Sequence, residues 1–66
     1  MNLVDRSEEL GRQAFKDGVK CVPMYDRVFI KEIIEPEYAR HPHEWGCCNA
    51  YYDAWMRAWT TENLKS

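Results

Sequence analysis

The chain has 66 residues, with three Trp, four Tyr, two Phe and a formal net charge of −2. A chain of about 60 residues is a single domain that buries only ~60% of its unfolded surface, so aromatic side chains must supply much of its core. Acidic and basic residues are mixed along residues 1–66, without a basic block or an acidic tail. This pattern argues against DNA mimicry and against non-specific nucleic-acid binding through a dense cationic tract.

The three cysteines, Cys21, Cys47 and Cys48, are odd in number, and two of them are adjacent. A secreted disulfide scaffold has an even and spaced set of cysteines, and the first five residues become charged too early for a signal peptide. No apolar run approaches the ~20 residues that a membrane span needs. We therefore expect a cytoplasmic protein that does not engage membranes.

The first predicted helix runs from about residue 5 to residue 17. Asp5 can cap its start, with Glu8 completing a capping box, and Gly18 suits the C-terminal cap. At about 100° per residue, the centre of its apolar face consists of small side chains. Such a face predicts a groove that receives another helix, and a mid-helix glycine, which costs ~1 kcal/mol, points the same way. The small residues are Ser7, Gly11, Ala14 and Gly18.

The second predicted helix spans about residues 26–35. Asp26 can cap its start, and Pro36 is expected to end it. The run Val28-Phe29-Ile30 also suits a β-strand, because these residue types are common in strands. Alternation fails at Ile33-Ile34, and the pattern therefore favours a helix.

The third predicted helix spans about residues 43–60, and the tail beyond it is expected to fray. The run His41-Pro42-His43-Glu44 is typical of a helix start, with Pro at the first helical position and Glu at the third. One flank of this helix is small and matches the groove of the first: Cys47, Ala50, Ala54 and Ala58. The opposite flank is large: Trp45, Cys48, Tyr51, Tyr52, Trp55, Met56 and Trp59. The sequence therefore predicts a small all-α, three-helix domain with a close contact between the first and third helices.

Two histidines and the three cysteines could supply zinc ligands: His41, His43, Cys21, Cys47 and Cys48. The spacing argues against such a site, because no Cys-x-x-Cys pair is present and adjacent helical side chains point about 100° apart. We interpret the cysteines as buried thiols, with zinc as the alternative. A nucleophilic Cys–His pair lacks any sign of an oxyanion hole, and no glycine-rich phosphate loop is present. We therefore expect no metal, no cofactor and no enzymatic activity.

Two sets of side chains are candidates for binding. The first is a basic patch on and just after the first helix, which could contact phosphates: Arg6, Arg12, Lys16 and Lys20. A solvated face with a Glu8–Arg12 pair at i,i+4 is the competing interpretation of that patch. The second set is an aromatic face on the third helix, which could stack on bases or form a protein-binding hot spot: Trp45, Tyr52, Trp55 and Trp59. The apolar arc is wide enough that we expect part of it to be core and part to be interface.

Two segments carry a resemblance to a known family. The run Gly11-Arg12-Gln13-Ala14-Phe15-Lys16-Asp17-Gly18, followed by Pro23 and Tyr25, resembles the first half of the ribosome modulation factor family. There the pattern is Gly-x-x-Ala-x-x-x-Gly followed by a Pro-aromatic pair. The run Tyr51-x-x-Ala54-Trp55-x-x-Ala58 is similar to the family's Trp-x-x-Gly-Trp-x-x-Ala pattern. The chain differs in its longer central segment, about residues 24–50, and in its mildly acidic charge.

The resemblance implies a helical fold and a ribosomal partner, because this family binds bacterial ribosomes near the 3′ end of the small-subunit RNA and promotes hibernating ribosome dimers. One hypothesis is therefore a non-enzymatic regulator or inhibitor of the ribosome that contacts RNA. The alternative is a small inhibitor, of the kind that phages make, which docks on a host protein complex through the aromatic face. A homodimer through the same face is a further candidate.

Overall fold

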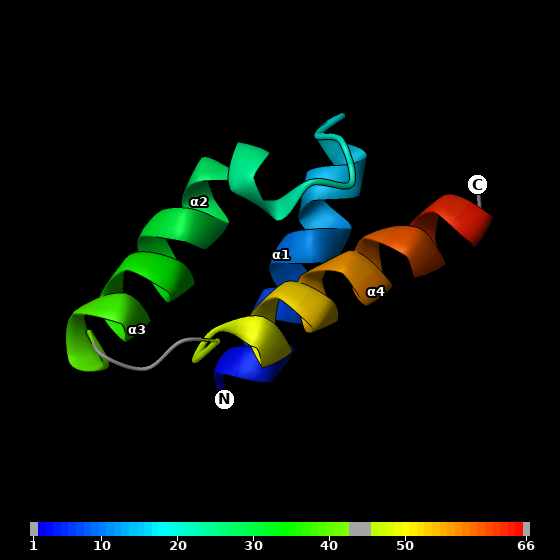
Figure 1. Ribbon diagram of the computed structural model, residues 1–66. Helices are drawn as coiled ribbons and strands as arrows, with labels where there is room; N and C mark the ends of the chain where they lie inside the picture. The colour runs from blue at the N-terminus through cyan, green and yellow to red at the C-terminus, as the bar shows by residue number, and fades with distance from the viewer. Residues whose placement is uncertain (1, 43–45, 66) are drawn as a thin grey trace.

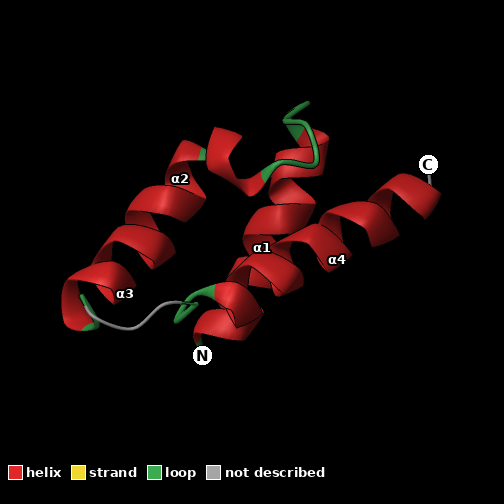
Figure 2. Cartoon of the chain, viewed as in Figure 1, coloured by secondary structure: helices red, strands yellow, loops and turns green. Residues whose placement is uncertain are grey.

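The computed structural model describes residues 2–42 and 46–65, and within these residues the chain is helical, with no strand. Two long helices, α1 (Leu3–Lys16) and α4 (Asn49–Lys65), pack against each other. After α1, a short 3₁₀ turn, η1 (Pro23–Tyr25), leads into the segment that connects the two long helices. This segment is α2 (Arg27–Phe29), the π-helical segment η2 (Ile30–Ile34) and α3 (Glu35–Arg40), which follow one another as a single helical arm over residues 27–40 (Figures 1 and 2). The predicted all-α class is confirmed.

The close contact between the first and last helices is confirmed at Gly11. A methyl group added at Gly11 would overlap the backbone carbonyl oxygen of Trp55 and would lie 3.0 Å from its carbonyl carbon. Ala14, Ala54 and Ala58, three of the predicted small residues, are buried as well. The small face of α1 therefore lets the backbone of α4 approach directly, as the sequence predicts, but Gly18 and Ala50, which were predicted on the two small faces, are exposed.

The C-terminal end of α1 agrees with the prediction, whereas its N-terminal end does not. The helix begins at Leu3, because the side-chain oxygen of Asn2 accepts a hydrogen bond from the Asp5 backbone N–H at 2.8 Å, so the predicted cap at Asp5 is wrong. Gly18 ends the helix with a φ of +82°. The Val19 N–H donates to the Ala14 carbonyl, and the Gly18 N–H donates to the Phe15 carbonyl. These two bonds form a Schellman cap, and the left-handed backbone explains the glycine.

The second helix starts as predicted and ends later than predicted. Asp26 caps α2 by accepting the Phe29 N–H at 3.3 Å. Pro36 does not end the arm, which continues to Arg40. The turn before Pro36 is π-helical, with the Glu35 N–H bonded to the Ile30 carbonyl five residues earlier. The widened turn lets the proline enter at the start of α3, where a missing N–H does not interrupt an established α-helical ladder.

The last helix begins and ends later than predicted. Residues 43–45, where the predicted start lies, are outside the described residues. In the described chain, α4 begins at Asn49 after a turn at residues 46–48, and the Cys48 carbonyl accepts hydrogen bonds from the Tyr51 and Tyr52 N–H groups. The helix continues to Lys65, so the predicted end near residue 60 is wrong. The segment contains no glycine or proline to stop it, and Lys65 pairs with Glu62 at 3.6 Å.

The core lies where the arm meets α1 and α4. Its largest fully buried side chains are Trp55 of α4 and Phe29 and Ile33 of the arm. The Trp55 indole N–H donates to the Asp26 carboxylate at 2.9 Å, so the same carboxylate caps α2 and satisfies the buried indole. The partially exposed apolar residues Leu3, Val19 and Met56 pack around this centre.

Candidate binding surfaces

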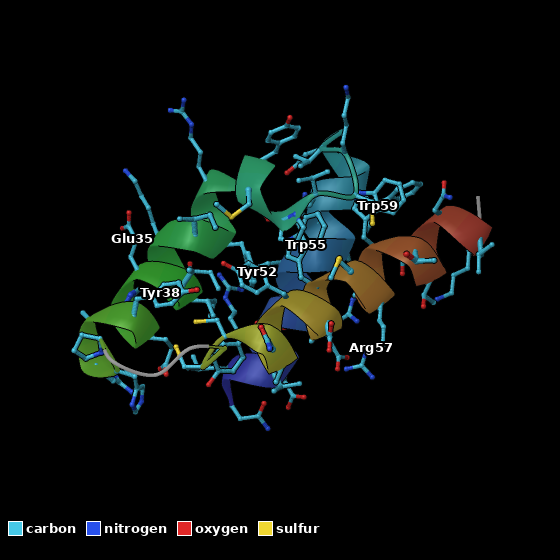
Figure 3. The ribbon with its side chains drawn as sticks, in the orientation of Figure 1. Glu35, Tyr38, Tyr52, Trp55, Arg57 and Trp59 are labelled. Carbon is cyan, nitrogen blue, oxygen red and sulfur yellow. The ribbon has the colours of Figure 1, made fainter. Side chains whose placement is uncertain are left out.

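The predicted aromatic face contributes mainly to the core. Figure 3 shows Tyr52, Trp55 and Trp59 projecting from α4 to the same side, whereas Arg57 points away from them. Trp55 is 0% exposed, and its ring centroid lies 6.1 Å from that of Phe29. A partner could therefore contact Trp55 only after the core had repacked. In this conformation the role of Trp55 is structural.

Tyr52 and Trp59 flank Trp55 and are partially exposed. The Trp59 indole N–H donates to the Val19 carbonyl at 2.8 Å, and its ring meets Phe15 edge-on at 5.3 Å. The Tyr52 ring stacks edge-on with Phe29 at 5.8 Å. Burial raises the pKa of the Tyr52 hydroxyl, with a smaller contribution from the nearby Tyr38. Both side chains thus have internal partners and present only part of their surface to solvent. Trp45 lies outside the described residues.

Arg6, the first residue of the predicted basic patch, is engaged by two carboxylates. Its guanidinium forms a two-point contact with Glu32 at 2.8 and 2.9 Å and a further bond with Glu9 at 2.9 Å. The hydrogen bond from Arg6 holds the pKa of the Glu32 carboxyl below its usual value. Because two carboxylates surround one guanidinium, Arg6 joins α1 to the arm and offers little free positive charge to a ligand.

Arg12 and Lys16 lie one turn apart on α1 and remain available. Both line a hollow of about 410 Å³ between α1 and the arm, and Val28 lies on its far side. Among the described residues, no ion pair joins Glu8 to Arg12, so the predicted Glu8–Arg12 pair is wrong. Lys20 lies beyond the Gly18 cap and is exposed. The structure therefore brings three of the four predicted basic residues, Arg6, Arg12 and Lys16, to one groove, and Arg6 is engaged there by carboxylates.

Sequence reasoning missed an exposed apolar surface that we call the apolar strip. It comprises Val22, Met24, Tyr25 and Val28, whose exposed fractions are 40%, 64%, 64% and 51%. These residues lie on η1, on the residue before it and on the first turn of α2, within seven consecutive residues. At the inner edge of the strip, the Met24 sulfur accepts a hydrogen bond from the Tyr52 hydroxyl at 3.9 Å. The strip is apolar surface that the fold itself does not cover.

The positive charge of the chain is concentrated around this strip. Residues 12–31, which we call the cationic segment, carry five Lys or Arg and two Asp, a net charge of +3. The remaining residues carry four Lys or Arg and nine Asp or Glu, a net charge of −5. The interpretation of the charges as evenly mixed is therefore wrong at the scale of segments. Counting charge in windows, rather than along the whole chain, would have revealed the asymmetry.

The residues weighed as alternative zinc ligands do not converge in the described part of the chain. The Cys47 and Cys48 sulfurs lie 3.6 Å apart, whereas Cys21 lies near Thr60 at 3.9 Å. No group of three or more His, Cys, Asp or Glu in the described residues could hold a metal ion. Burial raises the pKa of the Cys48 thiol to about 12. His43 is outside the described residues.

No protein-family model, curated protein or solved structure matches the chain. The resemblance to the ribosome modulation factor family therefore stays a prediction. None of the helices in residues 2–42 and 46–65 is long and apolar enough to cross a membrane.

Proposed function

We propose that this chain is a non-enzymatic binding protein that binds a macromolecular assembly and regulates or inhibits it, with the ribosome as the first candidate. The observation that carries the proposal is the net charge of +3 on residues 12–31 within a chain of net charge −2. Concentrated positive charge attracts polyanions and raises the rate of association with them. The ribosome presents a dense surface of RNA phosphates, which such a segment would contact.

The residues proposed to contact phosphates are Arg12, Lys16 and Lys20. Arg12 and Lys16 line the hollow between α1 and the arm, and Lys20 is exposed nearby in sequence. Arg6 is left out of this set because Glu32 and Glu9 already neutralise it. The proposed place of action is the cytoplasm, supported by an odd set of three cysteines, two of them adjacent.

A second candidate function is a small inhibitor, of the kind that phages make, which docks on a host protein complex through the aromatic helix face. The partial exposure of Tyr52 and Trp59 favours it. Because Trp55 is buried, the part of this face that the structure describes offers such a partner the outer edges of Tyr52 and Trp59.

The two candidates are separated by capture from a bacterial lysate with the tagged chain, with and without ribonuclease. We expect ribosomal particles to be captured without ribonuclease, to be lost with it, and to dissociate steeply as salt rises. The variant Lys16→Glu with Lys20→Glu should lose the particles, and Arg57→Glu with Lys65→Glu, which makes the same change in net charge at exposed positions outside the cationic segment, is the matched control.

The opposite pattern would support the second candidate. Capture of one protein complex that resists ribonuclease and salt, and that is lost on Trp59→Ala, assigns the aromatic face as the binding surface. An added in vitro translation assay tests regulation directly, because a ribosomal inhibitor should lower protein synthesis. Capture of no assembly under either condition contradicts the proposed function.

A further inference from the structure

We infer that the apolar strip and the surrounding cations form one docking surface for an acidic, amphipathic segment of a partner protein. This inference rests on the proposed function, since it names a protein component of the target assembly as the occupant of the apolar strip, beside the RNA phosphates proposed for Arg12, Lys16 and Lys20. Three observations carry it: the exposure of the strip, the placement of the cations beside it, and the aliphatic character of most of its side chains.

The first observation is how much apolar surface the strip exposes. Among the described residues, six large apolar side chains are exposed, and four of them form the strip. Burying such surface against an apolar partner contributes ~25 cal/mol per Å². A cluster of this kind, as opposed to scattered single residues, is typical of an interaction site.

The second observation is that cations border the strip at both ends and along one side. Lys20 precedes Val22 by two residues, and Lys31 follows Val28 by three, which is about one helical turn. Arg12 and Lys16 of α1 face Val28 across the hollow between α1 and the arm. Arg27, adjacent to Val28, is also exposed.

The acidic groups near this surface are already engaged. Glu9 bonds to Arg6, and Asp17 accepts a hydrogen bond from Gln13 at 3.0 Å. Asp26 is buried between the α2 N-terminus and the Trp55 indole. The neutral donors leave the charges of Asp17 and Asp26 in place, but five Lys or Arg in residues 12–31 outnumber these two carboxylates, so the field at the strip is positive. A partner that covers the strip with acidic side chains gains charge complementarity.

The third observation favours a protein over RNA at this surface. Phosphates would match the cations, but single-stranded RNA gains affinity by stacking bases on aromatic side chains. Only Tyr25 of the strip has an aromatic ring, while Val22, Met24 and Val28 are aliphatic. A helix with apolar residues at i, i+3 and i+4 and acidic residues on either side matches both the apolar strip and its cationic border.

The inference is tested with defined probes and fluorescence anisotropy. The first probe is a labelled Leu- and Glu-rich amphipathic peptide of about 18 residues, long enough to form a helix. The second has the same composition in scrambled order, and the third is an oligouridylate RNA of equal formal charge. We expect the amphipathic peptide to bind at least about tenfold more tightly than either control probe.

Two pairs of variants locate the site. Tyr25→Ser with Val28→Ser removes exposed apolar surface, and Arg27→Glu with Lys31→Glu reverses the local charge. Each double variant should weaken peptide binding at least about tenfold. The matched controls, Leu64→Ser and Lys65→Glu, change an exposed apolar residue and an exposed cation outside the strip and should stay within about twofold. Circular dichroism confirms that every variant remains helical.

Equal binding of the scrambled peptide, tighter binding of the RNA, or unchanged binding by the Tyr25–Val28 variant overturns the inference. These outcomes are distinct from failure of the proposed function. If the lysate experiment captures an assembly that the Tyr25–Val28 variant captures equally well, the surface is wrong and the function stands. If the peptide binds as expected and no assembly is captured, the surface stands and the function is wrong.

Discussion

At the residue scale, Gly11 shows how one missing side chain determines a helix contact. Alanine is the better helix former by ~1 kcal/mol, so propensity alone favours Gly11→Ala. The structure opposes that substitution, because the added methyl group would meet the Trp55 backbone carbonyl. A backbone group cannot move aside as a flexible side chain can, and the two helices would have to separate.

We therefore expect Gly11→Ala to lower the free energy of unfolding by at least about 1 kcal/mol, since overpacking a close contact costs about 1–3 kcal/mol. Urea unfolding followed by circular dichroism measures the change. Gln13→Ala, at an exposed position on the same helix, is the control and should change stability by less than about 0.5 kcal/mol. A stabilised Gly11→Ala variant would show that the helices are farther apart than described.

A second prediction at the residue scale concerns the reactivity of the Cys48 thiol. Its pKa is raised from 9.0 to about 12 by burial, and the thiolate is the reactive form. At pH 8 only about one Cys48 thiol in 10⁴ is ionised. Iodoacetamide should therefore modify the partially exposed Cys21 and Cys47 well before Cys48, as read by peptide mass spectrometry. Modification of Cys48 at the same rate as Cys47 would contradict its burial.

The same pKa shift links stability to pH. The unfolded chain loses the Cys48 proton near pH 9, whereas the folded chain keeps it until about pH 12. The free energy of unfolding should therefore fall as pH rises from about 9 to 12, because deprotonation favours the unfolded chain. Burial also raises the Tyr51 and Tyr52 pKa values, which adds to the fall. Urea unfolding at several pH values measures the slope, which Cys48→Ala should make shallower.

At the element scale, the arm is tied to α4 through Asp26. One carboxylate oxygen caps α2, and the other accepts the Trp55 indole N–H. Removing the carboxylate loses a helix cap and leaves a buried donor without a partner. The first loss costs about 1 kcal/mol and the second about 1–3 kcal/mol.

Asp26→Ala should therefore lower the free energy of unfolding by about 2–4 kcal/mol. A double-mutant cycle with Trp55→Phe isolates the indole hydrogen bond, and we expect a coupling of about 1 kcal/mol. Calorimetry or urea unfolding of the four proteins provides the values. Additive effects of the two substitutions would mean that the Trp55 indole does not depend on Asp26.

The elements also show which features could be predicted from sequence. Gly11 and Ala14 revealed the helix contact, because small residues along one face of an amphipathic helix allow a second helix to pack closely there. The prediction that Pro36 ends the second helix was wrong, because the periodicity of the residues does not indicate a π-helical turn that accommodates a proline. The sequence could not show which large side chains of α4 are core and which are surface. Trp55 and Trp59 lie one turn apart on the same side of the helix, and the position of the arm decides which of them is buried.

At the whole-molecule scale, the excess positive charge and the exposed apolar strip occupy the same part of the chain. The cationic segment carries +3 and the rest of the chain −5, and the apolar strip lies inside the cationic segment. Two copies that met strip to strip about a two-fold axis would bring like charges together.

We therefore expect the chain to be monomeric at low salt and to associate weakly as salt rises, because screening removes the repulsion between the cationic segments while apolar attraction remains. Sedimentation equilibrium at about 0.05 M and 0.5 M sodium chloride, where the Debye length falls from about 14 to about 4 Å, measures this dependence. Tyr25→Ser with Val28→Ser should stay monomeric at both salt concentrations, with Leu64→Ser as the control that behaves like the parent chain. A dimer that is tighter at low salt would instead indicate attraction between the cationic segment of one copy and an acidic surface of the other.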